Sequence, residues 1–312
     1  MKKILITGGA GYLGSMISTG LVNKGYKVTV IDKLIYSKTS LLHLLSHKNF
    51  LFVEGDVTDE KIMKKYIKNQ DIIIPLAALV GAPLCQKKPK IAVELNVNAI
   101  KYLCRISKSN QKIIYMTTNS GYGVGEKNKF CDENSTLRPI SLYGKTKNEA
   151  EKIVKKRGNY VAFRLATVFG FSYRMRTDLL VNFMVLTALT KKKIEIFEPN
   201  FRRNFVHISD VSNAIIHTIQ NFEKMKNNVY NLGLSNANIT KINLLKKIKK
   251  HIPELKIIIN RKKKDPDKRD YFVSNRKIEK KGFKAKFSLD DGIEELINVF
   301  KYIKNLKLKN NY

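Results

Sequence analysis

The stretch Ile4-Leu5-Ile6-Thr7-Gly8-Gly9-Ala10-Gly11-Tyr12-Leu13-Gly14 decides the fold. Residues 4–7 are apolar and β-branched but too few for a helix, so they predict a short strand. The glycines at 9, 11 and 14 form a Gly-x-Gly-x-x-Gly pattern, with Gly8 in front of it. Glycine there permits a tight turn, close approach of the backbone to a pyrophosphate, and close packing of helix on strand.

A helix that opens at Tyr12 points its free N–H groups and the positive end of its dipole at that phosphate. A glycine turn alone also fits a structural βαβ unit without a ligand, but Asp32 ends the next predicted strand, Lys27–Asp32. A carboxylate there accepts hydrogen bonds from an adenosine ribose and repels a 2′-phosphate, which favours NAD over NADP. Lys33 beside it weakens that preference. The predicted cofactor-binding residues are Gly8, Gly11, Tyr12, Leu13, Gly14, Asp32 and Lys33.

Composition limits the class of protein. The chain has 312 residues, of which 43% are hydrophobic, and this suits one large or two small globular domains. No apolar run approaches the length of a membrane-spanning helix, and the start at Met1 lacks the apolar segment of a signal peptide. Three scattered cysteines and five dispersed histidines predict reduced thiols, a cytoplasmic location and no metal site.

The net charge is +33, from 59 Lys and Arg against 26 Asp and Glu. Such a charge attracts polyanions, so nucleic acid is the obvious alternative partner. The lysines are spread through the whole chain, however, and no basic platform with interleaved aromatic residues occurs. We interpret the charge as a lysine-rich composition and the run 261–264 as a solvated loop, and we expect neither a nucleic-acid nor a membrane partner.

Predicted strands and helices alternate through the first half of the chain. After the two strands above, apolar runs predict strands at 50–54, 71–75, 112–117 and 160–165, with helices at 39–47, 90–109 and 143–157. Such alternation predicts an α/β fold with a doubly wound parallel sheet, whose ligands bind outside the carboxyl ends of the strands. Asp56, just after the third strand, either bonds an adenine amino group or caps the next helix.

Beyond Gly170 the alternation breaks, which predicts a smaller mixed lobe. The expected elements are helices at 178–191, 210–221, 240–250 and 291–305 and short strands at 194–197 and 204–207. We therefore expect a dinucleotide-binding domain over 1–170, with a return near 205–230, and a substrate-binding lobe over 171–312.

Three residues are candidates for catalysis: Thr118, Tyr143 and Lys147. Tyr143 and Lys147 are four residues apart and share one helix face. A neighbouring ammonium, together with the positive nicotinamide ring, is expected to lower the phenol pKa, so that Tyr143 can take a proton from a substrate alcohol. Thr118 would fix the same substrate oxygen, and Lys147 would also hold a ribose. An exposed Tyr/Lys pair is the alternative, but the dinucleotide fold and the Thr-bearing strand end favour catalysis.

These features together resemble the extended short-chain dehydrogenase/reductases, which include nucleotide-sugar epimerases, dehydratases and 4-dehydrogenases. The motifs are TGGAGYLG at 7–14, Asp56-Val57, Leu76-Ala77-Ala78, Thr117-Thr118, YGKTK at 143–147, RLATVFG at 164–170 and RRNFVHISDV at 202–211. The resemblance runs over essentially the full chain. It implies a Rossmann fold, NAD contacts at Asp56, Val57, Leu76, Ala77 and Ala78, Thr–Tyr–Lys chemistry at sugar C4, and a homodimer through the helix that bears Tyr143.

Two departures narrow the expected reaction. Family dehydratases place Asp-Glu directly after the catalytic Thr, whereas this chain has Asn119 and Ser120, which argues against 4,6-dehydration. Epimerisation stays open, because it needs only the three catalytic residues and room for the keto sugar to turn. The stretches at 76–85, 118–127, 163–170 and 265–275 further resemble bacterial 4-dehydrogenases that act on GDP-D-glycero-α-D-manno-heptose in capsular polysaccharide heptose synthesis.

The same resemblance supplies candidates for substrate binding. Arg203 matches a family arginine that meets the sugar nucleotide's phosphates, and Arg269 is a second candidate, since two guanidinium groups suit a diphosphate. Asn182 matches a family asparagine that faces the substrate, and Arg176 is a further candidate. A surface salt bridge is the alternative for each arginine. His207 is expected to be a structural hydrogen-bonding residue.

Three functions are therefore compared. The first is NAD-dependent oxidation of a nucleotide sugar at C4, with a GDP-linked heptose favoured. The second is 4-epimerisation at the same site. The third is a non-catalytic nucleotide- or nucleic-acid-binding protein, which the intact Thr118, Tyr143 and Lys147 argue against.

Overall fold

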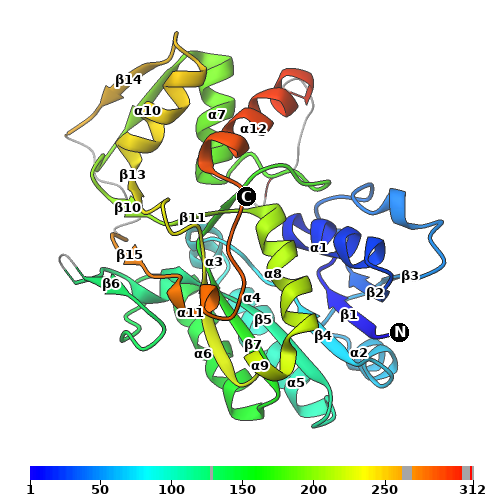
Figure 1. Ribbon diagram of the computed structural model, residues 1–312. Helices are drawn as coiled ribbons and strands as arrows, with labels where there is room; N and C mark the ends of the chain where they lie inside the picture. Colours follow the sequence, from blue (N-terminus) through cyan, green and yellow to red (C-terminus); the bar gives the residue numbers. More distant parts are fainter. Residues whose placement is uncertain (127–128, 262–268, 304–309, 311–312) are drawn as a thin grey trace.

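A computed structural model describes residues 1–126, 129–261, 269–303 and 310. A parallel sheet lies between two layers of helices, and a smaller group of helices and short strands lies beyond one end of its strands (Figure 1). The described sheet has seven strands in the order β12-β7-β5-β4-β1-β2-β3, and every pair in it is parallel. Its strands are β1 (Lys3–Thr7), β2 (Lys27–Asp32), β3 (Phe50–Glu54), β4 (Ile72–Pro75), β5 (Lys112–Thr118), β7 (Tyr160–Leu165) and β12 (Asn228–Leu232). The predicted doubly wound fold is confirmed.

Alternate side chains of each strand enter different layers. Ile4 and Ile6 of β1 join the core formed with α1 (Tyr12–Asn23) and α8 (Ile208–Gln220), while Leu5 joins the opposite core. That second core is covered by α2 (Glu60–Ile67), α5 (Ala99–Ile106) and α6 (Leu142–Arg157). Because both faces are buried, the strands are continuous apolar runs, which is the pattern that made them predictable.

The long helix expected at 90–109 is confirmed as an unbroken helical segment from Pro89 to Ile106, but part of it is not α-helical. It consists of α4 (Pro89–Val93), a π-helical turn at Glu94–Asn98 and then α5. Asn96 in that turn is 1% exposed, and its amide exchanges two hydrogen bonds with the backbone of Leu79, at 2.9 and 3.0 Å. It also donates to Thr146 of α6. The π-turn therefore places one amide where it anchors the loop after β4.

Other expectations for single elements also need correction. The helix expected at 39–47 is only a 3₁₀ turn, Leu42–Leu44. The strand β12 was missed, because polar residues interrupt the sequence Asn228–Leu232. Thr118, expected to follow the fifth strand, is its last residue and pairs with Leu165. Residues 304–305 of the last expected helix lie outside the described residues, as do 262–264 of the basic run.

The smaller lobe packs around its own core, which includes Val185, Leu244 and Leu296. Its helices are α7 (Leu180–Lys191), α10 (Lys241–His251) and α12 (Leu289–Ile303). We propose the division expected from the sequence, with 1–170 and a return near 205–230 as one domain and 171–312 as the other.

The remaining elements belong to both lobes. They are the helices α3 (Ala82–Lys87), α9 (Phe222–Met225) and α11 (Arg276–Glu279), and four pairs of short strands: β6 (Phe130–Cys131) with β15 (Phe272–Val273), β8 (Thr167–Phe169) with β11 (Phe205–His207), β9 (Lys193–Ile196) with β14 (Lys256–Ile259), and β10 (Arg202–Arg203) with β13 (Ile239–Thr240).

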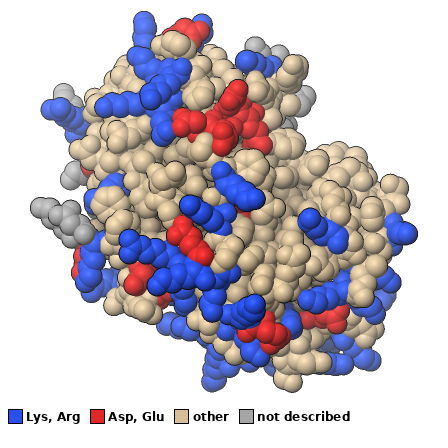
Figure 2. Space-filling view, viewed as in Figure 1, with Lys and Arg blue, Asp and Glu red and all other residues tan. Residues whose placement is uncertain are grey.

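Lysine and arginine side chains are spread over both lobes on the face drawn in Figure 2. This distribution agrees with a lysine-rich composition, and the absence of a nucleic-acid partner stays a prediction. Within the described residues, no helix combines the length and apolar character needed to cross a membrane.

We expect Gly8→Ala to destabilise the fold much more than Gly25→Ala. Both glycines have a positive φ, +72° and +82°, so an added Cβ costs about 1 kcal/mol at either position. At Gly25 the Cβ meets nothing within 4 Å, but at Gly8 it lies 2.5 Å from the backbone nitrogen of Ala77. The free energy of unfolding should therefore fall by about 2–4 kcal/mol for Gly8→Ala. Urea denaturation with unchanged m-values measures both, and equal losses would show that Ala77 does not crowd Gly8.

Candidate active site

The glycine turn joins β1 to α1 at the carboxyl edge of the sheet. A Cβ on Gly14 would lie 2.3 Å from the carbonyl oxygen of Gly8, so the helix and the turn are in direct contact. Helix α1 begins after Gly11, whose lack of a side chain leaves the first N–H groups without a side-chain cap, and its first turn has no acidic residue. The N–H groups of Tyr12, Leu13 and Gly14 and the helix dipole therefore fit a bound phosphate.

Asp32 ends the neighbouring strand β2. One carboxylate oxygen accepts from Ala10 N at 2.9 Å, and the other accepts from Leu34 N at 2.8 Å. Burial raises the pKa of Asp32, while these two N–H groups and the charge of Arg174 oppose the rise. A carboxylate oxygen has more than one lone pair, so each oxygen can also accept from a ribose hydroxyl. The turn and Asp32 together fit a dinucleotide.

Lys33 and Asp56 bond to each other, since Lys33 Nζ lies 2.7 Å from Asp56 Oδ2. The other oxygen of Asp56 accepts from the N–H and hydroxyl of Thr58, both at 2.9 Å. The cap of α2 is Asp59, which accepts from Lys61 N and Ile62 N. Of the two roles considered for Asp56, capping the helix is therefore wrong, and its contact with a cofactor stays a prediction.

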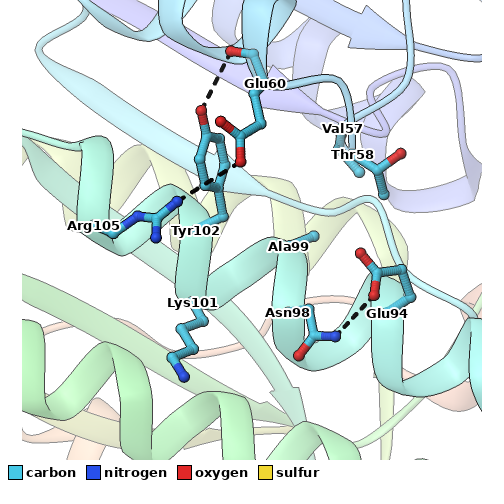
Figure 3. A pocket seen from close by; sticks show the side chains of 9 residues that line it. All are labelled: Val57, Thr58, Glu60, Glu94, Asn98, Ala99, Lys101, Tyr102 and Arg105. Atoms are coloured by element: carbon cyan, nitrogen blue, oxygen red, sulfur yellow. Dashed lines mark hydrogen bonds and ion pairs between the residues drawn. The ribbon is translucent and has the colours of Figure 1, made fainter.

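Val57 and Thr58 line a cavity of about 310 Å³ beside α5 (Figure 3). On its other side Glu60 pairs with Arg105 at 3.7 Å, and its backbone oxygen accepts from Tyr102. Thr118, Tyr143 and Lys147 do not line this cavity, so it is separate from the candidate catalytic group.

The loop after β4 crosses the glycine turn. Leu76 N donates to the carbonyl of Thr7 at 2.8 Å. The backbone of Ala77 packs against Gly8, in the space that a Cβ at position 8 would occupy. Ala78 follows before Leu79, where Asn96 fixes the backbone. These three predicted cofactor residues thus lie beside the glycine turn.

The structure brings Thr118, Tyr143 and Lys147 together. Thr118 is 8% exposed at the end of β5, and Tyr143 and Lys147 lie in the first half of α6. The side chain of Tyr143 is half-buried, and Thr118 is among the groups that act on its pKa. Lys147 is 6% exposed, with Nζ 4.3 Å from the centre of the Tyr115 ring. A phenol and a threonine hydroxyl can therefore share one substrate oxygen, with an amine beside them.

The expected lowering of the Tyr143 pKa is wrong for the groups of the protein itself. Burial raises the pKa of Tyr143 to about 12, and the charges of Arg176 and Arg269 and the hydrogen bond to Thr118 only partly offset this. Burial also lowers the pKa of Lys147 to about 7 against the charge of Glu151. The opposing charges on Tyr143 therefore come mainly from arginines that spacing in the sequence did not bring near it.

Arg203 and Arg269 lie side by side. Arg203 is 3% exposed and donates to the backbone oxygens of Arg202, at 2.8 Å, and of Arg269. Arg269 Nη1 in turn donates to the hydroxyl of Ser120, two residues beyond Thr118. The guanidinium of Arg269 thus lies beside the candidate catalytic group, and that of Arg203 contacts the backbone of Arg269; two guanidinium groups suit a diphosphate.

Arg176 and Asn182 belong to a buried network at the start of α7. The guanidinium of Arg176 pairs with Asp178, and its charge also acts on Tyr143. Asn182 is fully buried, accepts from Gly170 N at 3.1 Å and donates to Arg176 O at 2.8 Å. Its side-chain amide is thus already hydrogen-bonded to backbone atoms, so any contact of Asn182 with substrate stays a prediction.

His207 has the structural role expected from the sequence. It caps α8 by accepting from Ser209 N, and its other ring nitrogen lies 2.9 Å from Glu295. The ring stacks on Phe287 with centroids 4.6 Å apart.

Sequence reasoning missed two polar residues of this site. Arg174 is 3% exposed, lies 4.6 Å from the Tyr36 ring, and its charge reaches Asp32. Ser120 was considered only as the replacement of an acid, yet it joins Arg269 to Thr118. The sequence Arg174-x-Arg176, with two arginines close together, was a signal for Arg174. The role of Ser120 depends on its contact with Arg269, which spacing in the sequence does not show.

Comparison with known proteins gives a consistent result. A model of the "NAD dependent epimerase/dehydratase family" matches residues 4–233. The chain is 28% identical over 272 residues to dTDP-D-glucose 4,6-dehydratase of Dictyostelium discoideum, which covers 80% of this chain and 62% of that protein. It is 28% identical to UDP-glucose 4-epimerase of Lactobacillus helveticus, over 75% of this chain and 77% of that one. A crystal structure of UDP-glucuronic acid 4-epimerase from Bacillus cereus with UDP-glucuronic acid and NAD aligns with a TM-score of 0.82 and 25% identity, covering 96% and 99% of the two chains.

Proposed function

Because the chain belongs to the NAD dependent epimerase/dehydratase family, we propose that it oxidises C4 of a nucleotide-linked sugar to a ketone. Family membership makes NAD its cofactor, and the glycine turn with Asp32 fits that dinucleotide. The observation that carries the proposal is the grouping of Thr118, Tyr143 and Lys147 at the carboxyl edge of the sheet.

Bound NAD would accept a hydride from the sugar carbon. Tyr143 takes the proton of the C4 hydroxyl, since Thr118 and Tyr143 belong to one group of side chains at this edge of the sheet. Thr118 holds the same sugar oxygen in place. Lys147, buried over Tyr115, holds a cofactor ribose and supports the phenolate with its charge. Arg203 and Arg269 bind the diphosphate, with Arg176 and Asn182 as further substrate contacts.

The residues after Thr118 support oxidation without loss of water. Asn119 and Ser120 are buried at 1% and 3% exposure, and neither side chain titrates near neutral pH. Elimination of water from a 4-keto sugar needs an acid and a base at the next carbons. Neither of these two positions can supply such a group.

GDP-D-glycero-α-D-manno-heptose is our favoured substrate, with a role in capsular polysaccharide biosynthesis. The support is the sequence resemblance at 76–85, 118–127 and 163–170; the stretch 265–275 lies partly outside the described residues. The relatives named above act on UDP- and dTDP-linked sugars, so a GDP-linked substrate needs its own test. We also propose a cytoplasmic location and a homodimer formed through α6.

A 4-epimerase is the second candidate, because the Lactobacillus helveticus relative carries that name. The same three catalytic residues serve both reactions, and the difference is whether the hydride returns to the sugar. The mass of the product therefore separates them.

The test incubates purified protein with GDP-heptose, GDP-mannose or UDP-glucose and measures product mass. Oxidation gives a ketone about two mass units lighter than the substrate, whereas epimerisation leaves the mass unchanged and alters only the chromatographic position. An unchanged substrate in all three reactions would contradict the proposal that the chain acts on these sugar nucleotides.

A further inference from the structure

A chain of hydrogen bonds links Arg269 to the catalytic hydroxyl groups. Arg269 Nη1 donates to Ser120 Oγ, and Thr118 Oγ1 donates to the same oxygen at 3.0 Å. The backbone N–H of Ser120 donates back to Thr118 Oγ1 at 3.1 Å, and Thr118 is among the groups that act on the pKa of Tyr143. Ser120 is only 3% exposed, so water does not compete freely for these contacts.

The backbone around Arg269 is fixed on three sides. The carboxylate of Asp270 receives two bonds of 2.9 Å from the guanidinium of Arg202. The backbone oxygen of Asp270 accepts from Gly125 N at 2.9 Å, and that of Arg269 accepts from Arg203. The contact between Arg269 and Ser120 is therefore part of a built arrangement.

Hydroxyl protons determine what Thr118 can do in this arrangement. A hydroxyl has one proton to donate and two lone pairs that accept. The proton of Thr118 is directed at Ser120, so in this state it is not available to an oxygen of the substrate. In this state Thr118 is turned away from its catalytic role.

We propose that Ser120 is a positioning residue that couples recognition of the substrate's diphosphate to the orientation of the Thr118 hydroxyl. The proposal rests on the proposed function. When a diphosphate takes the guanidinium of Arg269, Ser120 loses that donor and can direct its own proton to Thr118. Thr118 then donates to the oxygen shared by Tyr143 and the sugar. The catalytic hydroxyl thus adopts its reactive orientation when the nucleotide is bound.

This coupling makes Ser120 a competitor of the diphosphate for Arg269. In Ser120→Ala the competitor is gone, so GDP or UDP alone should bind about three- to tenfold more tightly, as expected for one hydrogen bond to a charged group. Turnover should nevertheless fall about tenfold, because Thr118 loses the partner that orients it. Tighter nucleotide binding with slower turnover is the signature, since a merely structural defect weakens both.

The experiment titrates NAD-loaded protein with GDP and with UDP by calorimetry, and measures kcat on a nucleotide sugar that the wild type converts. Ser120→Thr keeps the hydroxyl and should restore wild-type affinity. Ser120→Cys, similar in size but a poor acceptor, should tighten binding if Ser120→Ala does not fold. Thr117→Val is the matched control, because the neighbouring Thr117 hydroxyl is buried without a hydrogen-bond partner among the described residues.

Unchanged or weaker GDP and UDP binding in both Ser120→Ala and Ser120→Cys would overturn the coupling, as would equal tightening in Thr117→Val. The proposed function fails differently. It fails if the wild type binds neither nucleotide and converts no sugar nucleotide, whatever the Ser120 variants do.

Discussion

Tyr143→Phe should lower kcat by about 10²- to 10⁴-fold while the affinity for NAD stays close to that of the wild type. The substitution removes one oxygen from a half-buried ring that packs beside Leu84, Cys85 and Ala92, so the helix and its packing are retained. What is lost is the phenol oxygen, the group that we propose takes the C4 proton. Steady-state kinetics with the preferred sugar nucleotide, and calorimetric titration with NAD, measure the two quantities.

Tyr160→Phe is the matched control for loss of a tyrosine hydroxyl. Tyr160 is 4% exposed and begins β7, at the end of the strand away from the candidate active site. Its variant should keep wild-type kcat. A Tyr143→Phe protein with wild-type turnover would show that another group takes the substrate proton.

Lys147→Met should lower kcat by about 10²- to 10³-fold and also weaken NAD binding about tenfold. Methionine fills a similar volume over the Tyr115 ring but supplies neither charge nor hydrogen-bond donors. The combined loss differs from that of Tyr143→Phe, because Lys147 acts on both the phenol and the cofactor ribose. Lys145→Met, an exposed lysine two residues earlier on the same helix, is the control and should change neither value.

The Lys147→Met substitution should also change how the free energy of unfolding depends on pH. Burial lowers the pKa of Lys147 to about 7, whereas an unfolded lysine titrates near 10.4. Between these values the unfolded chain holds a proton that the folded chain does not, so the free energy of unfolding of the wild type should rise with pH. Lys147→Met should lack this contribution to the rise. Identical pH dependence of the two unfolding free energies would contradict the buried position of Lys147.

Six of the seven described strands of the sheet could be predicted because they contain apolar runs, whereas polar residues interrupt β12. The strand Lys27–Asp32 has the predicted bounds, and so does Phe50–Glu54. The helix expected over 90–109 is present, but its π-helical turn was not predicted. Periodicity reports which face is apolar, but it does not show that Asn96, within that turn, hydrogen-bonds the backbone of Leu79.

The site was predictable only in part. Spacing placed Tyr143 and Lys147 on one helix face, but the sign of the phenol pKa shift depends on burial, which spacing does not report. The contact of Arg269 with Ser120 joins residues 149 positions apart, so local sequence gave no signal for it. Those unpredicted contacts set the electrostatics around Tyr143.

Transfer of deuterium from C4 tests the central claim most directly. The wild-type protein is incubated with the preferred sugar nucleotide deuterated at C4, and the bound cofactor is released and measured by mass spectrometry. We expect the deuterium in the reduced cofactor, and almost none when Tyr143→Phe is treated in the same way. Deuterium that passes to water while the product forms would contradict hydride transfer from C4 to the cofactor, whereas deuterium that returns to C4 of an epimer would contradict net oxidation and identify the 4-epimerase.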